Sequence, residues 1–294
     1  MTPFFSIVIP TYNRAALLKL TLISLFNQSY QNFEILVIDD GGNDHTEDVV
    51  KAFEDPRITY YWKENAERGA ARNYGANLAK GSYLNFFDSD DVAYENHLQT
   101  AADYIIANLD VIVFHTSYNW KFPNTEVVNS TTVNLGVLNS KIFKNNILSA
   151  NNVFVRKPEF DLLKFSENRA LSRVEDWELW IRLCCRYEIY GLPQVTSTVI
   201  EHQQRSTSNV AGDDVLAYGK VLVESLKYDV LVCKMPGNII KNIDAEMKSL
   251  AALYYSIEDK KEKSIKYFFK SFLLRPSIIY SRRTLAIFKY LLIK

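Results

Sequence analysis

YLNFFDSDD, residues 83–91, runs from an apolar half into three carboxylates. The apolar half has the composition of a buried strand, so Asp88, Asp90 and Asp91 fall at its carboxyl end. Three neighbouring acids repel one another, and a simple turn is satisfied by Asn, Gly or Ser. A divalent cation relieves the repulsion, because Mg²⁺ and Mn²⁺ prefer oxygen ligands. A solvated acidic turn is the simpler explanation for such a cluster in isolation, so the surrounding sequence has to decide.

Strand-like and helix-like segments alternate before this stretch. The β-rich runs lie at residues 6–14, where Pro10 interrupts an apolar stretch, at 33–38 and at 58–62, and the helical patterns at 15–27, 45–53 and 68–80. This alternation predicts βαβ units and a parallel sheet. In such sheets ligands bind outside the carboxyl ends of the strands. Tyr12, Asp39 and residues 88–91 are therefore expected to share one crevice.

Four ordered motifs resemble family 2 glycosyltransferases of the GT-A fold. They are SIVIPTYNR (6–14), FEILVIDDGGND (33–44), ENAERGAARNYGANLAKGSYLNFFDSDD (64–91) and VEDWELWIRL (174–183). The match covers about residues 4–205. It implies an α/β fold, a Rossmann-like and mostly parallel sheet flanked by helices, followed here by a C-terminal helical extension. It also implies a nucleotide-sugar-dependent transferase, usually inverting, with Mn²⁺ or Mg²⁺ held by the DxD.

The resemblance assigns the donor site. Uridine recognition needs a stacking face and an acceptor for the ring N–H, and the family places these at positions matching Tyr12 and Asp39. Arg72 resembles the family's basic residue near the nucleotide. A surface arginine paired with a nearby acid such as Glu67 is a competing explanation, and Arg68 is a second candidate.

The remaining donor and metal residues follow the same pattern. Asp88 is expected to contact ribose or metal, Asp90 to bind the metal between the two phosphates, and Asp91 to meet sugar hydroxyls. The metal neutralises charge on the leaving nucleoside diphosphate. Further donor-site positions by resemblance are Pro10, Arg14, Ser89, Glu175 and Arg205. His202 is a third metal candidate, although a lone histidine is commonly structural.

Inversion requires a base on the opposite face of the sugar, since a hydroxyl is a poor nucleophile. Glu175 and Asp176 precede an amphipathic helix predicted over residues 177–183. Acids at a helix start also complement the helix dipole. Within the motif order, Asp176 matches the base of the family and Glu175 is the weaker candidate. Residues 202–208 are polar and predict a mobile loop that closes over the diphosphate.

The resemblance also divides the chain. Residues 1–212 are predicted to form the GT-A domain, with a nucleotide-binding part at about 1–116 and an acceptor-binding part at about 117–212. Strands are predicted at 110–116, 153–156 and 189–201, whereas 117–138 is polar and irregular. Residues 213–294 form a helical region with helices at 214–228, 238–257, 260–274 and 277–294, and residues 249–277 resemble a tetratricopeptide helix pair.

Charge is distributed unevenly along the chain. Basic and acidic residues balance at 34 each, but residues 260–294 hold ten Lys or Arg and one Glu, which leaves 24 against 33 elsewhere. This basic end carries apolar side chains at Ile278, Leu285, Ile287, Phe288, Leu291 and Leu292. It suits an anionic membrane surface as a peripheral contact, and equally a helix packed on its own domain. No stretch offers the about 20 uninterrupted apolar residues that a spanning helix needs.

Length and cysteine content agree with an intracellular enzyme. A chain of 294 residues, 48% hydrophobic, can bury a large core. Three cysteines form no disulfide framework, and no secretory signal opens the chain, so we expect a cytoplasmic protein. The membrane alternative for the basic C-terminal end would place it peripherally at the inner face of the plasma membrane. The expected partners are a nucleotide-sugar donor, with UDP-sugar favoured, and a glycan or lipid-linked acceptor of bacterial surface polysaccharide synthesis, without nucleic acid.

Two other function classes share part of these features. A metal-dependent sugar-nucleotide hydrolase or nucleotidyltransferase uses the same phosphate and metal groups, but does not need the Glu175–Asp176 pair. A catalytically silent scaffold would tolerate the loss of Asp90 or Asp176, and both are present.

Overall fold

A computed structural model describes residues 2–122, 128, 130–202, 205, 210–235 and 237–293. The chain divides into two compact units. The first contains Met1–Leu138, Leu148–Ser172 and Tyr187–Gln203, and the second contains Asn139–Ile147, Arg173–Arg186 and Gln204–Lys294. Two short segments from the middle of the chain therefore group with the C-terminal helices.

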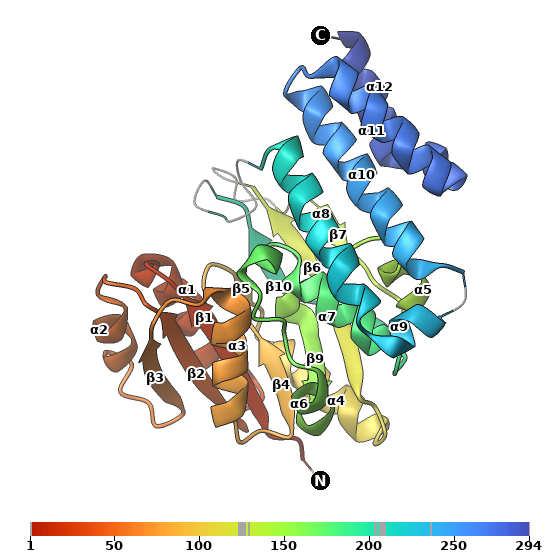
Figure 1. Cartoon of the computed structure of the whole chain (residues 1–294). Helices are drawn as coiled ribbons and strands as arrows, with labels where there is room; N and C mark the ends of the chain where they lie inside the picture. Colours follow the sequence, from red (N-terminus) through yellow and green to blue (C-terminus); the bar gives the residue numbers. More distant parts are fainter. Residues whose placement is uncertain are drawn as a thin grey trace. The chain divides into compact units, whose positions relative to one another are not determined.

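The first half of the first unit is a parallel sheet, as the alternation predicted. Its strands are β1 (Phe5–Thr11), β2 (Phe33–Asp40), β3 (Ile58–Lys63) and β4 (Tyr83–Phe86), in the spatial order β3-β2-β1-β4. The helices between them are α1 (Ala15–Phe26), α2 (Thr46–Lys51) and α3 (Glu67–Leu78). β1 lies between β2 and β4, with Thr11 opposite Asp39 and Val8 opposite Phe86. The carboxyl ends of β2 and β4 therefore flank that of β1 (Figure 1).

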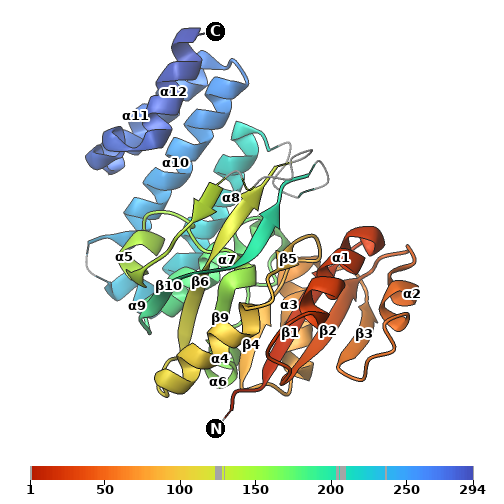
Figure 2. The ribbon, with the colours of Figure 1, turned by 180° about the vertical axis from the view of Figure 1, so that it is seen from behind.

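Helices cover both faces of this sheet (Figures 1 and 2). On one face, α1 and α4 (His97–Ala107) bury their apolar sides in the main core. That core includes Phe5, Ile7, Ile9, Leu18, Leu22, Leu25, Leu98 and Ala101. On the other face, α3 approaches β1 so closely that a Cβ on Gly75 would lie 2.4 Å from Val8 Cγ1. This contact explains a glycine in the middle of α3, where it costs helix stability.

The second half of the sheet is mixed. β9 (Val153–Arg156) runs antiparallel between β4 and β6 (Val113–Lys121), and β10 (Ile189–Ile200) is parallel to β6. Short antiparallel strands complete the sheet: β5 (Val92–Ala93), β7 (Ser130–Thr132) and β8 (Gly136–Val137). The first unit also contains α6 (Lys157–Leu163) and the 3₁₀ turns η1 (Ala150–Asn152) and η2 (Arg169–Leu171).

The polar region after residue 116 was wrongly predicted as irregular at its start. β6 begins at Val113 and continues to Lys121. Its polar side chains are buried with hydrogen-bond partners, because Thr116 Oγ1 lies 2.7 Å from Thr196 Oγ1 and Ser117 Oγ donates to the Leu192 carbonyl at 2.7 Å. Buried polar groups of this kind are stable only when they are paired, and composition does not reveal such pairs.

The second unit is helical. Its elements are α5 (Asn139–Ile142), α7 (Glu175–Cys184), α8 (Gly212–Lys227), α9 (Val230–Lys234), α10 (Ile239–Ile257), α11 (Lys261–Leu274), η3 (Pro276–Tyr280) and α12 (Arg282–Ile293). The segment predicted as one helix from 277 is therefore a 3₁₀ turn followed by α12. Ala252, Phe268 and Ile287 form the core where α10 packs with α11 and α12 (Figures 1 and 2). No helix in the described part of the chain is both long and apolar enough to span a membrane.

Candidate functional site

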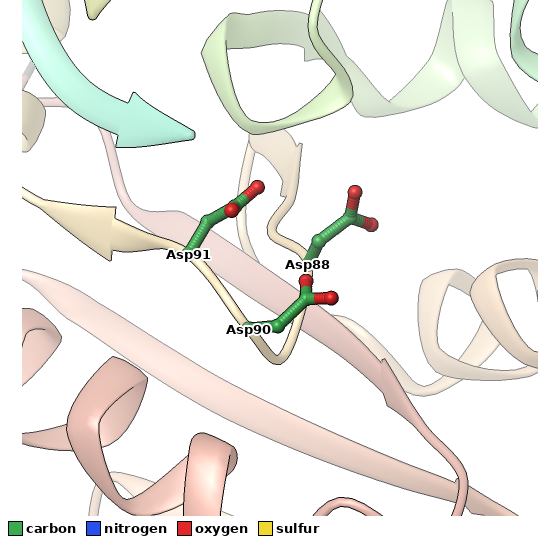
Figure 3. Close-up of side chains that lie close together, drawn as sticks. All are labelled: Asp88, Asp90 and Asp91. Atoms are coloured by element: carbon green, nitrogen blue, oxygen red, sulfur yellow. The ribbon is translucent and has the colours of Figure 1, made fainter. Parts of the chain in front are cut away.

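The acidic turn, residues 88–91, connects β4 to β5. One carboxylate oxygen from each of Asp88, Asp90 and Asp91 lies within 4.8 Å of the others (Figure 3). Asp90 and Asp91 are buried, and so is Ser89 between them. Three converging carboxylates offer the oxygen ligands that Mn²⁺ and Mg²⁺ accept, so the residue types at this turn fit a divalent cation.

Three basic side chains contact the acidic turn. Asp90 Oδ2 accepts a hydrogen bond from Arg14 Nη1 at 2.6 Å and lies 2.9 Å from His202 Nε2. Arg72 Nη2 donates to Asp88 Oδ1 at 2.8 Å. The two guanidinium groups offset the mutual repulsion of the acids. Residues distant in the sequence thus meet at the carboxyl end of β4.

Arg72 is not the surface arginine of the competing explanation. Only 2% of its surface is exposed, and its ion-pair partner is Asp88. Glu67, the acid suggested as its partner, lies 3.9 Å from Arg169 instead. Arg72 therefore lies in the site, on the inward face of α3.

Asp91 is held by groups from two other strand ends. Its Oδ1 accepts from the backbone N–H of Ile200 at 2.8 Å, and its Oδ2 accepts from Asn151 Nδ2 at 2.7 Å. Ile200 ends β10, two residues before His202, so this bond also fixes the start of the segment that carries the histidine. Asp91 joins β10 to the acidic turn.

Asp39 lies near the carboxyl end of β2, on the other side of β1 from β4, and is buried. Its Oδ1 accepts from the backbone N–H of Gly42 at 2.8 Å, and its Oδ2 accepts from the Tyr60 hydroxyl at 2.8 Å. Burial, together with the hydrogen bond to Asp39 and its charge, raises the pKa of Tyr60 above the usual tyrosine value. Tyr12 follows Thr11, which lies opposite Asp39, and 51% of its surface is exposed. An exposed ring beside a fixed acceptor suits a planar base.

Two loops at this edge are tied together. Asn13, at φ 51°, accepts a hydrogen bond from the Asn43 backbone through Oδ1 at 2.8 Å. Asparagine tolerates this left-handed conformation better than most residues. Asp44 Oδ2 accepts from the Ala15 backbone at 2.9 Å. Burial opposes the ionisation of Asp44, but hydrogen bonds from Thr46 and Ala15 outweigh it and lower its pKa. These bonds tie the segment 10–14, which begins at Pro10 opposite Ile38 and ends at Arg14, to the loop after β2.

The residues assigned to the base, together with Arg205 of the predicted phosphate loop, belong to the second unit. Glu175 and Asp176 form the first turn of α7, which begins two residues earlier than predicted. Glu175 is buried, while Asp176 Oδ1 accepts from the Trp177 backbone at 2.6 Å and from Asn146 Nδ2 at 3.2 Å. Arg205 is half-buried. The other positions of the predicted loop, 203–204 and 206–208, lie outside the described residues.

Sequence reasoning missed two residues of the first unit. Tyr60 donates to Asp39, and Asn151 bonds to two positions of the acidic turn. Tyr60 occupies an ordinary strand position in the sequence, and Asn151 is one of several asparagines in a polar stretch. No local pattern marks either residue, because each acts on a strand end that is distant in the sequence.

A mixed sheet whose parallel strands end in polar side chains, with an acidic turn after β4, is the architecture of GT-A glycosyltransferases. Residues 6–166 match the family described as Glycosyl transferase family 2, and the chain belongs to this family. One relative is the "Uncharacterized glycosyltransferase RC0461" of Rickettsia conorii, 27% identical over 275 residues, which covers 92% of this chain and 44% of the relative. The chain thus spans less than half the length of that protein.

Solved structures share the fold. TarS 1–349 of S. aureus, in complex with UDP-GlcNAc, superposes with a TM-score of 0.70 at 19% identity, covering 98% of this chain and 88% of that one. The mannosyltransferase PcManGT of Pyrobaculum calidifontis, in complex with GDP-Man and Mn²⁺, has a TM-score of 0.62 at 16% identity, covering 100% and 88%. At these identities the likeness establishes the GT-A fold.

Proposed function

We propose that this chain transfers a hexosyl group from a UDP-sugar to a hydroxyl of a glycan or lipid-linked acceptor, with inversion at the anomeric carbon. The pathway that fits this reaction is the synthesis of bacterial surface polysaccharide. The observation that carries the proposal is the convergence of Asp88, Asp90 and Asp91 at the same sheet edge as Asp39, which lies one residue before the end of β2. A metal ligand set and a nucleobase acceptor at one edge are what a nucleoside diphosphate requires.

Tyr12 and Asp39 are the proposed uracil contacts. The exposed Tyr12 ring offers a stacking face, and Asp39 accepts the ring N–H through a carboxylate whose orientation Gly42 and Tyr60 hold. TarS, which shares the fold, was solved with UDP-GlcNAc and supports a uridine donor, whereas PcManGT was solved with GDP-Man. Nucleotide choice is therefore the first property to measure.

Asp88, Asp90 and His202 are the proposed ligands of Mn²⁺ or Mg²⁺. The cation, when bound, stabilises the negative charge that develops on the leaving diphosphate. Arg14 and Arg72, which contact Asp90 and Asp88, can also bind phosphate oxygens, and Arg205 is the third proposed phosphate contact. Ser89, Asp91 and Glu175 remain proposed contacts to the donor.

The nucleotide is tested by calorimetric titration with UDP, GDP and dTDP, each with and without Mn²⁺. We expect UDP to bind selectively and to require the cation. Selective GDP binding would replace the uridine assignment, and the absence of binding under every condition would refute the donor site.

Asp176 is the proposed general base that removes the proton of the acceptor hydroxyl. Replacing it with Asn keeps the hydrogen bond that the Trp177 backbone donates to Oδ1 but removes basicity. We expect Asp176→Asn to lower turnover by about 10²- to 10⁴-fold, the range for general base catalysis, and to leave UDP affinity unchanged. Asp161→Asn, at a partly exposed acid paired with Lys157, is the matched control. Retained turnover in Asp176→Asn would show that another group is the base.

We also propose that α11 and α12 contact an anionic membrane surface. Each helix exposes an apolar stripe: Ile265, Phe269 and Leu273 on α11, and Leu285, Phe288 and Leu292 on α12. Beside the stripes lie cations without a carboxylate partner in the described part of the chain: Lys261, Lys266, Lys270, Arg282 and Lys289. Apolar side chains flanked by Lys or Arg suit the boundary between headgroups and acyl chains. The inner face of the plasma membrane, which is anionic, is the surface that this chemistry fits.

Burial corrects the residues first assigned to this contact. Ile278 and Ile287 are buried inside the second unit, and Leu291 packs against the same core. On α11, Ile265 and Phe269 are exposed, whereas Ser264, Phe268 and Ser271 are buried. Deleting residues 277–294 would therefore expose the core, so point substitutions on the stripes give the cleaner test.

The test is cosedimentation with phosphatidylglycerol-containing vesicles and with phosphatidylcholine vesicles. We expect binding to the anionic vesicles only, and its loss in the double variant Phe269→Ser, Leu285→Ser. Leu109→Ser, at an exposed position of the first unit, is the control. Unchanged vesicle binding in the double variant would refute the membrane contact. Size-exclusion chromatography of the wild type without vesicles is the second control, because a monomeric wild type excludes self-association as the cause of sedimentation.

A further inference from the structure

Asn151 connects both ends of the acidic turn through one side chain. It lies in η1, immediately before β9, and is fully buried. Its Oδ1 accepts from the backbone N–H of Asp88 at 2.8 Å, and its Nδ2 donates to Asp91 Oδ2 at 2.7 Å. A single amide thus fixes the backbone at the first acid and the carboxylate of the last.

The chemistry of these two bonds suits a carboxamide. Asp88 presents a donor and Asp91 an acceptor, so the side chain between them must offer one acceptor and one donor. The bond to Asp91 is made to a carboxylate inside the protein, where charge-assisted hydrogen bonds are strong. Since the other oxygen of Asp91 accepts from the Ile200 backbone, the plane of this carboxylate is fixed from both sides.

A buried polar network supports Asn151 in turn. The backbone carbonyl of Asn151 accepts from Asn85 Nδ2 at 2.8 Å, and Asn85 Oδ1 lies 3.3 Å from His97 Nε2. The other ring nitrogen of His97 lies 2.8 Å from Thr196 Oγ1. Burial lowers the pKa of His97 to about 3, so the ring is neutral and can donate from one nitrogen and accept at the other. Fully paired networks of this kind are rigid.

We propose that Asn151 is a positioning residue for the divalent cation, because its bonds to the Asp88 backbone and to the Asp91 carboxylate fix both ends of the turn that carries the proposed ligands Asp88 and Asp90. The inference rests on the proposed function, in which the acidic turn binds Mn²⁺ or Mg²⁺. Partners that orient metal ligands commonly change metal affinity by about 10- to 100-fold when they are replaced. Asn151 touches no proposed ligand atom of Asp90 or His202, so it acts through the geometry of the turn.

Asn152 provides a matched control. It is the next residue of η1 and is equally buried. Its amide bonds to Thr116, Ser117, Thr196 and Ser197. Asn152→Ala therefore removes a buried amide of the same size from the same turn while leaving the hydrogen bonds between Asn151 and the acidic turn in place.

The experiment titrates Mn²⁺ into wild type, Asn151→Ala and Asn152→Ala in saturating UDP, and follows free Mn²⁺ by electron paramagnetic resonance. We expect Asn151→Ala to bind Mn²⁺ about 10- to 100-fold more weakly, and Asn152→Ala to stay within about twofold of wild type. Urea unfolding shows whether the two variants lose similar stability. Asn151→Ala with wild-type Mn²⁺ affinity, or an equal loss in Asn152→Ala, would overturn the inference.

A second measurement covers the case in which Asn151→Ala does not fold. Asp91→Asn keeps an acceptor for the Ile200 backbone but changes the group that Asn151 orients. If the inference holds, Asp91→Asn alone weakens Mn²⁺ binding, and Asn151→Ser adds less than about threefold in that background, because coupled residues are not additive. Independent, multiplicative losses would overturn the inference. A wild type that binds no Mn²⁺ would instead refute the proposed metal role itself.

Discussion

The ends of β2 and β4 start from similar sequences and form different sites. Both strands are apolar, both neighbour β1, and both run into adjacent acids. At β2 the acids have separate partners, since Asp39 accepts from Gly42 and Tyr60 while Asp40 pairs with Lys63 at 2.6 Å. At β4 the three carboxylates converge within 4.8 Å.

Backbone geometry explains this difference. β2 continues through Asp40, so Asp39 and Asp40 are consecutive strand residues and point to opposite faces of the sheet. β4 ends at Phe86, and the acidic turn folds back, with the Asp91 N–H 3.4 Å from the Asp88 carbonyl. A turn brings alternate side chains to one side. Strand termination, rather than the number of acids, therefore brings the three carboxylates together.

The largest expected effect is that of replacing Asp90, which tests whether the three carboxylates after β4 act together on a cation. Asp90→Ala removes the acid that contacts both Arg14 and His202. We expect Mn²⁺-dependent UDP binding to weaken by at least about 100-fold, because loss of a ligand exceeds the loss of a supporting bond. Calorimetry with and without Mn²⁺ measures it. Wild-type UDP affinity in Asp90→Ala would show that Asp90 is not a metal ligand. The ends of β2 and β4 would then not differ in cation binding.

The next effect tests Asp39 at β2. Asp39→Asn keeps the shape of the side chain but loses the charge that would strengthen the proposed bond to a uracil N–H. We expect UDP affinity to fall by about tenfold, the equivalent of one charged hydrogen bond, with an unchanged requirement for Mn²⁺. A change in the Mn²⁺ requirement would mean that the two strand ends are not separate sites.

Asp40 supplies the control for both experiments. Its carboxylate accepts from Lys63 Nζ at 2.6 Å and from the Ala66 backbone at 3.0 Å. We expect Asp40→Asn to lower the free energy of unfolding by about 1 kcal/mol, a modest value for a pair at the edge of the sheet. Urea denaturation measures it. UDP and Mn²⁺ affinities should stay at wild-type values, and a loss of either would contradict a purely structural role.

The smallest effect concerns Tyr60. Tyr60→Phe removes the donor that orients Asp39 Oδ2, and we expect UDP to bind about threefold more weakly, because Tyr60 would act on the nucleotide only through the orientation of Asp39. The raised pKa of Tyr60 adds a pH test. Above about pH 10 the tyrosine of the unfolded chain loses its proton while Tyr60 of the folded protein keeps it, so the wild type loses stability as the pH rises.

Urea unfolding between about pH 9 and 11 follows this loss. The decline should be shallower in Tyr60→Phe, because the variant has no proton to release at this position. Equal slopes in both proteins would contradict the raised pKa.

The first half of the fold was predictable because its signals are local. Apolar runs between helical patterns predicted β1 to β4 with small errors at their ends. The second half was less predictable, because Thr116 and Ser117 in β6 are polar and are buried with hydrogen-bond partners in β10 and at Asn134 and Asn152, which are distant in the sequence. Strands as short as β5 and β8, with two residues each, leave no periodic pattern to detect.

The candidate site divides in the same way. The acids at Asp39 and at residues 88–91 were predicted from their positions after strands, and so was a shared sheet edge. The pairing of Arg14 with Asp90, the burial of Arg72 and the bonds made by Asn151 were not. Each of these depends on which strand lies next to which, and that order is not encoded in any short segment.

The sequence by itself determined the family, the strand that leads into the acidic turn, and the direction in which that strand runs. Only the tertiary structure decided how the three carboxylates are held. Asn151 reaches Asp91 across 60 residues of sequence and Ile200 reaches it across 109. Short-range propensity sets the local conformation of a strand and its turn, whereas hydrogen bonds between distant segments form only after the sheet order has placed β9 beside β4 and β10 beside β5.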